Sequence, residues 1–157
     1  MKILAKSFII LFIPIIILAN TRTVAKVHSG DLIEIKGGFT IHLLGITVPD
    51  KSTKMGYKVY DFVKRLIEGR VVKLFTYTTN NQASGVVYDK DGYAYGQIVY
   101  GEGPVSRDWS VNLNELLLKK GYARVNHDML PDDVKHFVDL EKNARKKKLG
   151  IWKNSEK

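Results

Sequence analysis

The stretch His42-Leu-Leu-Gly-Ile-Thr-Val-Pro-Asp50 decides the fold of this chain, because it joins a strand to a turn that leads into a helix. It begins with the alternating faces of a strand. Pro49 ends that strand, since proline cannot donate a hydrogen bond into a sheet. Before it, Gly37 and Gly38 separate two strand-like runs, and both can take a positive φ at little cost. We therefore expect a hairpin followed by a turn that carries Asp50.

Outward from this stretch, the chain shows a helix and then further strands. Apolar side chains recur at i, i+3 and i+4 between Thr53 and Glu68, and Gly69 follows where a helix usually ends. The predicted strands span 26–36, 39–46, 71–77, 86–88 and 93–100, and helices are predicted at 53–68, at 113–120 and from 131 to 149. Five short strands with hairpin turns suit a small closed barrel better than a parallel sheet. The fold class expected is α+β dominated by β, with Ile151-Trp152 packed back on the barrel.

The first 25 residues have the pattern of a secretory signal. Lys2 and Lys6 precede an apolar run from 8 to 19, which is shorter than the roughly 20 residues of a bilayer span. Small residues suited to cleavage lie at Ala19 and Ala25, and an uncleaved membrane anchor is the alternative. We therefore expect a leader or anchor at 1–25, one domain at 26–153 and a tail at 154–157. The expected location is the periplasm or the medium, with membrane contact only through an uncleaved leader.

Charge and cysteine content narrow the function. The 157 residues include 25 Lys and Arg against 16 Asp and Glu, a formal net charge of +9. This balance favours anionic partners such as nucleic acid or lipid headgroups, although solubility alone is the simpler explanation. The chain has no cysteine. Disulfides, thiolate metal sites and a cysteine nucleophile are therefore excluded.

Several motifs together resemble the thermonuclease (staphylococcal nuclease-like) family. The first two are Gly30-Asp-Leu-Ile33 and Leu43-Leu-Gly-Ile-Thr-Val-Pro-Asp50. Two more lie downstream, Gly121-Tyr-Ala-Arg-Val125 after a short helix pattern and Ala144-Arg-Lys-Lys-Lys-Leu-Gly-Ile-Trp152 at the end. They occur in the family's order and cover roughly residues 26–153. The resemblance implies a five-stranded OB-type barrel with three helices, in agreement with the strand pattern.

The resemblance also implies where catalytic groups would lie. Family members cleave phosphodiesters with Ca²⁺, carboxylates and two arginines. Asp31 matches the first metal-binding aspartate, but the second such position is Thr47. The two arginine positions are His42 and Tyr93, and the general-base glutamate is Asp50. Since losing one preorganised charge-stabilising donor typically costs about 10²–10³ in rate, the resemblance implies a degenerate active site.

Each of these residues also has a purely structural interpretation. Asp31 could make a local hydrogen bond in its turn instead of binding metal, and Asp50 could cap the approach to the helix that follows. His42 could be satisfied by neighbours instead of binding phosphate. Tyr93 could fill space, or it could stack on a base as in single-strand binders.

Cations outside the motif positions are further candidates for nucleic-acid contact. They are Lys90, Arg107 and Arg124, and an arginine among them could replace a lost one in space. The run Arg145–Lys148 suits the end of a helix dipole, and it could also track phosphates.

The function expected is an exported thermonuclease-like domain with lost or strongly reduced phosphodiesterase activity, retained for binding nucleic acid or another anionic or protein ligand. One alternative is an active metal-dependent endonuclease with a rearranged site that uses Asp31 and Asp50. Another is a membrane-tethered envelope protein without a nucleic-acid role. Ca²⁺ is the cofactor that the resemblance implies, and we expect a monomer.

Overall fold

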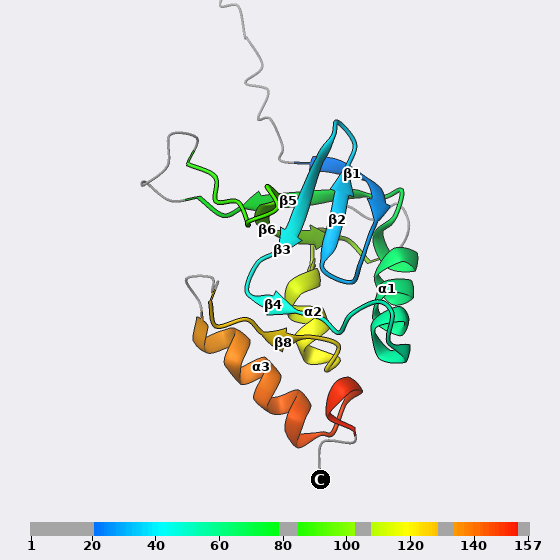
Figure 1. The fold of residues 1–157 in the computed structure, drawn as a ribbon, viewed down its shortest axis with the longest axis vertical. Helices are drawn as coiled ribbons and strands as arrows, with labels where there is room; N and C mark the ends of the chain where they lie inside the picture. The colour runs from blue at the N-terminus through cyan, green and yellow to red at the C-terminus, as the bar shows by residue number, and fades with distance from the viewer. Residues whose placement is uncertain (1–20, 79–84, 103–107, 129–133, 154–157) are drawn as a thin grey trace, which may run out of the picture.

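Five strands close into a barrel in the computed structural model, which describes residues 21–78, 85–102, 108–128 and 134–153 (Figure 1). The strands are β1 (Thr21–Val27), β2 (Leu32–Ile35), β3 (Phe39–Leu43), β5 (Val71–Thr76) and β6 (Ala94–Tyr100). They pair in the order β3-β2-β1-β5-β6, with antiparallel neighbours, and a parallel pairing of β3 with β6 closes the ring. The predicted five-stranded OB-type barrel, in a β-dominated fold with three helices, is therefore confirmed.

The helix predicted after the Asp50 turn is α1 (Lys54–Ile67). Thr53 is its N-cap, because the Thr53 hydroxyl accepts a hydrogen bond from the Gly56 backbone N–H at 3.0 Å. Val59, Val63 and Ile67 are buried against the barrel, as the apolar spacing predicts. The turn and the helix therefore form one rigid unit beside the barrel.

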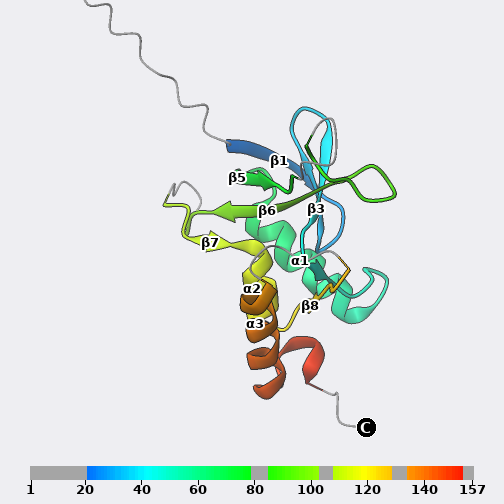
Figure 2. The same cartoon turned by 90° about the vertical axis from the view of Figure 1, so that its left-hand side faces the viewer.

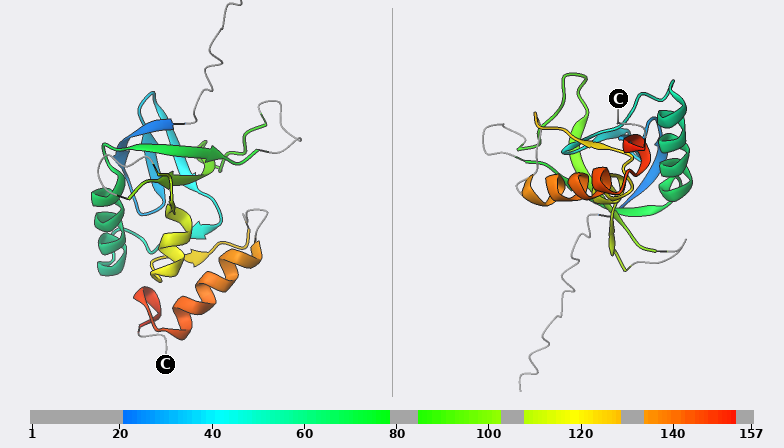
Figure 3. Two further views of the ribbon diagram at one scale, coloured as in Figure 1. Left: turned by 180° about the vertical axis from the view of Figure 1, so that it is seen from behind. Right: turned by 90° about the horizontal axis from the view of Figure 1, so that it is seen from below.

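The other helices lie at one end of the barrel, where Figures 1 and 2 show α3 next to α2. They are α2 (Leu113–Lys119), α3 (Val134–Lys146) and the 3-10 turn η1 (Gly150–Trp152). Three two-residue strands complete the chain, β4 (Ile46–Thr47), β7 (Val111–Asn112) and β8 (Arg124–Val125). Seen from behind in the left view of Figure 3, this end lies opposite the start of β1, and the right view shows the same end from below.

Several predicted boundaries were wrong. The expected strand 26–36 is two strands, because the chain turns at Gly30, where an added Cβ would lie 2.6 Å from Val59 Cγ1. The expected strand 39–46 is broken at Gly45, whose φ is 76°. Residues 86–88 form only isolated bridges. The last helix ends at Lys146, earlier than the Gly150 that was expected to stop it.

The N-terminal boundary also lies earlier in the structure. Thr21 and Thr23 of β1 pair with β5, and Val24 is fully buried, so the barrel includes residues that the sequence assigned to the leader. Among the described residues, no helix is long and apolar enough to cross a membrane. The apolar run at 8–19, Arg107, Pro131 and the tail at 154–157 lie outside the described residues.

Candidate functional site

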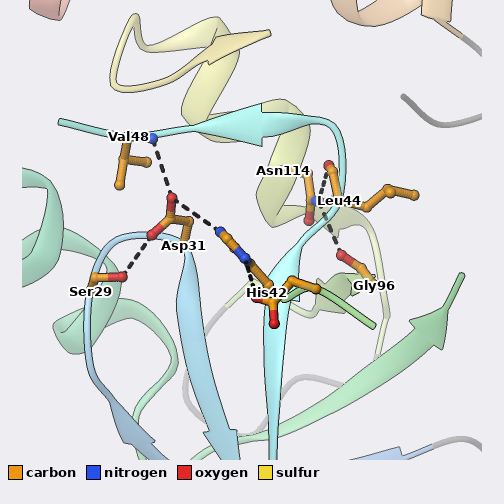
Figure 4. Close-up of polar contacts among 8 residues, drawn as sticks. Ser29, Asp31, His42, Leu44, Val48, Gly96 and Asn114 are labelled. Carbon is orange, nitrogen blue, oxygen red and sulfur yellow. Dashed lines mark hydrogen bonds and ion pairs between the residues drawn. The ribbon is translucent and has the colours of Figure 1, made fainter. Parts of the chain in front are cut away.

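Asp31 lies in the turn between β1 and β2, where its carboxylate is held by local hydrogen bonds (Figure 4). Oδ1 accepts from the Ser29 hydroxyl at 2.7 Å, and Oδ2 accepts from the Val48 backbone N–H at 3.3 Å. The second bond ties the start of β2 to the segment that carries Thr47 and Asp50. Asp31 therefore has the local role that the sequence left open, in addition to any role in binding.

His42 lies on β3 between two carboxylates. Its Nδ1 is 2.9 Å from Asp89 Oδ2, and its Nε2 is 3.8 Å from Asp31 Oδ2. The first contact is a hydrogen bond, and the second is an ion pair too long for one. The imidazole also stacks on the ring of Tyr95, with centroids 5.3 Å apart and planes 17° apart. We call Asp31, His42, Asp89 and Tyr95 the His42 cluster.

The sequence missed two members of this cluster, Asp89 and Tyr95. Asp89 begins the Asp89-Lys-Asp-Gly92 turn between the predicted strands 86–88 and 93–100, and its Oδ1 accepts the backbone N–H groups of Asp91 and Tyr93. Its other oxygen is then aimed at His42. Tyr95 meets His42 because β6 pairs in parallel with β3 and sets these two residues opposite each other. The Asp-x-x-Gly turn was the sequence signal for Asp89. The β3–β6 pairing, which brings this turn next to His42, is not visible in the sequence.

Charge in the cluster is mutually stabilised. The carboxylates of Asp31 and Asp89 raise the pKa of His42 above its ordinary value, although partial burial opposes them. Burial alone would raise the pKa of Asp31, but the nearby His42 ring and the hydrogen bond from Ser29 leave it lowered. The pKa of Asp89 is lowered in the same way, by the Tyr93 backbone N–H and His42 against the effect of burial. The cluster therefore stabilises the protonated imidazole and the two ionised carboxylates relative to their neutral forms.

Asp50 and Thr47 lie near the cluster in sequence but take no part in its contacts. The Asp50 carboxylate is exposed and accepts the Ser52 backbone N–H at 2.7 Å. Hydrogen bonding from Ser52 lowers the Asp50 pKa. Thr47 is exposed on β4. Asp50 thus shapes the entry to α1, and among the described residues no hydrogen bond or ion pair joins it to His42.

The remaining predicted residues are spread over different parts of the fold. Tyr93 is half-buried beside the Asp89 turn, and Lys90 lies within that turn. Arg124 pairs with Thr47 across β4 and β8, but its guanidinium carbon lies 5.1 Å from the Trp152 ring. Among the described residues, the ion pairs of Asp31 and Asp89 are made with His42 and with no arginine.

Buried Asn114 on α2 fixes the backbone around the cluster. Its Nδ2 donates to the Leu44 carbonyl at 2.9 Å and to the Gly96 carbonyl at 3.3 Å (Figure 4). Leu44 follows His42 by two residues, and Gly96 follows Tyr95. One amide therefore holds together the two strands whose side chains stack.

Comparison with known proteins agrees with this architecture. The sequence profile of the family described as staphylococcal nuclease homologue matches residues 40–154. The chain belongs to this family. It is also 28% identical over 117 residues to the staphylococcal-like nuclease CAN1 of Arabidopsis thaliana. That alignment covers 74% of this chain but only 30% of the plant protein.

Membership in the family allows the candidate site residues to be compared with the positions that the resemblance implies. The profile match includes His42, Thr47, Asp50 and Tyr93, whereas Asp31 precedes it. Asp31 nevertheless lies beside His42 in space. The family frame therefore brings Asp31, which the resemblance matches to a metal-binding aspartate, next to an imidazole at the position where the same resemblance implies an arginine.

The donors around Asp31 do not fit Ca²⁺ well. Calcium takes six to eight oxygen ligands, of which carboxylates supply the charge. Here a single carboxylate already accepts two hydrogen bonds and faces the His42 ring, while Thr47 adds at most a neutral oxygen. Within the described residues, no group of three or more His, Asp or Glu side chains is arranged to hold a metal ion.

Proposed function

We propose that this chain binds single-stranded nucleic acid at the barrel face that carries the His42 cluster, and that it hydrolyses phosphodiester bonds slowly or not at all. The observation that carries the proposal is the state of His42. Asp89 is hydrogen-bonded to one ring nitrogen and the Asp31 carboxylate lies 3.8 Å from the other, so both nitrogens face carboxylates where a guanidinium would clamp a phosphate.

Loss of both guanidiniums should remove most transition-state stabilisation. Each preorganised donor is typically worth about 10²–10³ in rate, because it meets charge that develops on the phosphoryl oxygens. Tyr93 supplies a ring in place of the second arginine, and Thr47 lacks the charge of a second metal carboxylate. Ca²⁺ should therefore bind weakly, and the proposal includes no step that depends on it.

Aromatic side chains support binding. Tyr95 stacks on His42, and register places Phe75 on the same face of the sheet, because Phe75 pairs with Gln97 two residues beyond Tyr95. Phe75 is 50% exposed. Tyr93, two residues before Tyr95, continues this row. Exposed rings along a β-barrel face stack on successive bases without regard to sequence, and each stacked base contributes about 1–3 kcal/mol.

One observation favours an active enzyme as the second candidate. The Asp89–His42 pair is an imidazole oriented by a carboxylate, which is the arrangement of many general bases. The His42 side chain is 31% exposed, and its Nε2 could meet a substrate if Asp31 moved. In this candidate His42 and Asp50, rather than arginines, would perform the chemistry.

Two assays on the full chain in an uncharged detergent separate the candidates. We expect a labelled oligothymidylate to bind. Phe75→Ala should weaken this binding, whereas Tyr95→Phe should retain it because Phe keeps the stacking ring. We also expect denatured DNA and RNA to stay intact with Ca²⁺, Mg²⁺ or Mn²⁺. Metal-dependent digestion that Asp50→Ala abolishes would overturn the proposal and favour the enzyme. Absence of binding would reject nucleic acid as the ligand.

We also propose that the chain is exported, and the structure limits where a leader could be cleaved without removing part of β1. Cleavage after Ala19 would keep all of β1, whereas cleavage after Ala25 would remove Val24 from the core and the pairing of Thr21 and Thr23 with β5. We therefore expect the mature chain, if it is cut, to begin near Asn20. N-terminal sequencing of chain recovered from the periplasm or medium tests both points, and a mature start at Lys26 would contradict this expectation.

A further inference from the structure

A second charged surface lies at the end of the molecule formed by the end of α3 and by η1. No acidic residue occurs between 142 and 153, whereas that segment carries six cations. All six are exposed. We call these residues the basic end, and they are Lys142, Arg145, Lys146, Lys147, Lys148 and Lys153.

Glycine packing brings two further cations to the basic end. Gly121 and Gly150 pack so closely that a Cβ on Gly150 would overlap the Gly121 carbonyl oxygen, and Ile151 N–H donates to that same oxygen at 2.8 Å. This contact docks η1 on the turn between α2 and β8. Lys120 and Arg124, which lie within three residues of Gly121, are thereby held beside the basic end although they precede it by at least 18 residues in sequence.

Like charges meet at Trp152. The guanidinium carbons of Arg124 and Arg145 lie 5.1 and 4.1 Å from its ring centre. Glu141 pairs with Arg145 at 3.3 Å, but among the described residues Arg124 makes no ion pair. Gathering cations this closely is unfavourable unless an anion offsets their repulsion.

The helix dipole of α3 explains only part of this charge. Dipole interactions fall off within the last turn, so Arg145 and Lys146 suffice for them. Lys147 and Lys153 lie beyond the helix, and Arg124 belongs to β8. Their shared location therefore needs another explanation.

The basic end is continuous with the segment that leads to the His42 cluster. An open pocket of about 210 Å³ lies beside Arg124 and Ile151, and its other walls are Thr47, Val48 and Pro49. The Val48 backbone N–H is bonded to Asp31. A chain of phosphates could thus pass from the basic end over the pocket toward Asp50.

We propose that the basic end and Arg124 bind the phosphate backbone of single-stranded nucleic acid and extend the strand held at the His42 cluster. This inference rests on the proposed function, but it concerns a different surface. A polyanion in solution fits better than a bilayer, because the start of β1, which follows the predicted leader, lies at the opposite end of the molecule (Figure 1).

The test is a salt titration of oligothymidylate binding to the full chain in uncharged detergent. The first variant is Lys142→Gln, Lys146→Gln and Lys147→Gln together, which leaves the Trp152 contacts intact. Its matched control removes the same charge elsewhere, by Lys26→Gln, Lys36→Gln and Lys54→Gln. A second variant, Arg124→Gln, tests the link through the pocket. Circular dichroism melting establishes that each variant is folded.

We expect the first variant to bind roughly 10- to 100-fold more weakly at about 0.1 M salt. The slope of its log binding constant against log salt concentration should fall in magnitude by about 2, because fewer phosphate contacts mean that fewer counterions are released on binding. Arg124→Gln should reduce the slope by about 0.7, and the control should keep the wild-type slope. Equal losses in variant and control would overturn the inference. Loss of binding to phosphatidylserine mixed micelles alone, with DNA binding unchanged, would overturn it in favour of a lipid surface. If Phe75→Ala abolishes binding while the basic-end variant does not, only the proposed function survives.

Discussion

The turn that leads into α1 and the His42 cluster lie side by side, yet they differ in what the family frame has kept. In the turn, backbone geometry explains the residues: Gly45 has a φ of 76°, and Thr53 caps α1. In the cluster, the family resemblance implies an arginine at the position of His42, so there we propose that the backbone frame is kept while the charged group differs. A frame fixed by backbone geometry can therefore persist when the chemistry grafted on it changes.

The largest expected effect is in the turn. A Cβ at Gly56 would overlap the Asp50 carbonyl oxygen, so Gly56→Ala must shift α1 or the turn. We expect it to lower the free energy of unfolding by about 3 kcal/mol, the upper range for overpacking. Urea denaturation followed by circular dichroism measures this loss. Gly69→Asn is the control, because Gly69 has a φ of 77° that Asn tolerates and open space around it. Equal losses in both variants would show that the turn is not tightly packed.

The next effect links the two regions. Asn114→Ala would leave the buried Leu44 and Gly96 carbonyls without their amide donor, which should cost about 2 kcal/mol. It should also loosen the contact between His42 and Tyr95. Thermal unfolding gives the cost, and the control is Asn126→Ala, which removes a local bond to the Asp128 N–H near the surface. If Asn114→Ala lowers stability no more than the control does, Asn114 does not hold together the strands that carry His42 and Tyr95.

The smallest effect is in the cluster and depends on pH. The raised pKa of His42 means that its contribution to stability is fully present below about 6.5, its usual unfolded value, and is lost as pH rises through the folded pKa. The lowered pKa values of Asp31 and Asp89 give the opposite limit, a loss as pH falls below about 3.9 toward their folded values. We expect His42→Gln to cost about 1 kcal/mol at pH 6, the size of one hydrogen bond, and progressively less at alkaline pH.

Proton titration of the imidazole by NMR checks the same contact directly. Wild-type His42 should titrate above about 6.5, and Asp89→Asn should lower its pKa because it removes one of the two carboxylates. A His42 resonance that titrates at or below the unfolded value in the wild type would mean that the carboxylates do not hold a charged ring.

Local patterns in the sequence predicted much of the fold. The Gly37-Gly38 hairpin, the start of α1 near Thr53 and the α2 end near Gly121 are set by residues close in sequence, and each was found. The Thr53 cap itself was not predicted, because Asp50 was the capping candidate. The start of β1 was missed because its pairing with β5 joins residues about 50 apart. Two-residue strands such as β4 and β8 carry no periodic signal at all.

The site was less predictable than the fold for the same reason. The positions of Asp31 and His42 followed from motif resemblance, and their proximity was observed. Asp89 and Tyr95 reach His42 only through the parallel β3–β6 pairing, which closes the barrel between distant segments. Arg124 was a candidate to replace a lost arginine, but its partner is Trp152, which no local pattern indicates.

The central claim is that missing side chains, not a missing frame, limit hydrolysis. The most direct measurement compares the initial rate of Ca²⁺-dependent digestion of denatured DNA by the wild-type chain with that by His42→Arg, Thr47→Asp, Asp50→Glu and Tyr93→Arg combined. We predict background rates for the wild type and digestion by the combined variant, with each arginine contributing about 10²–10³ in rate. Wild-type digestion that matches the combined variant and disappears in Asp50→Ala would contradict the account.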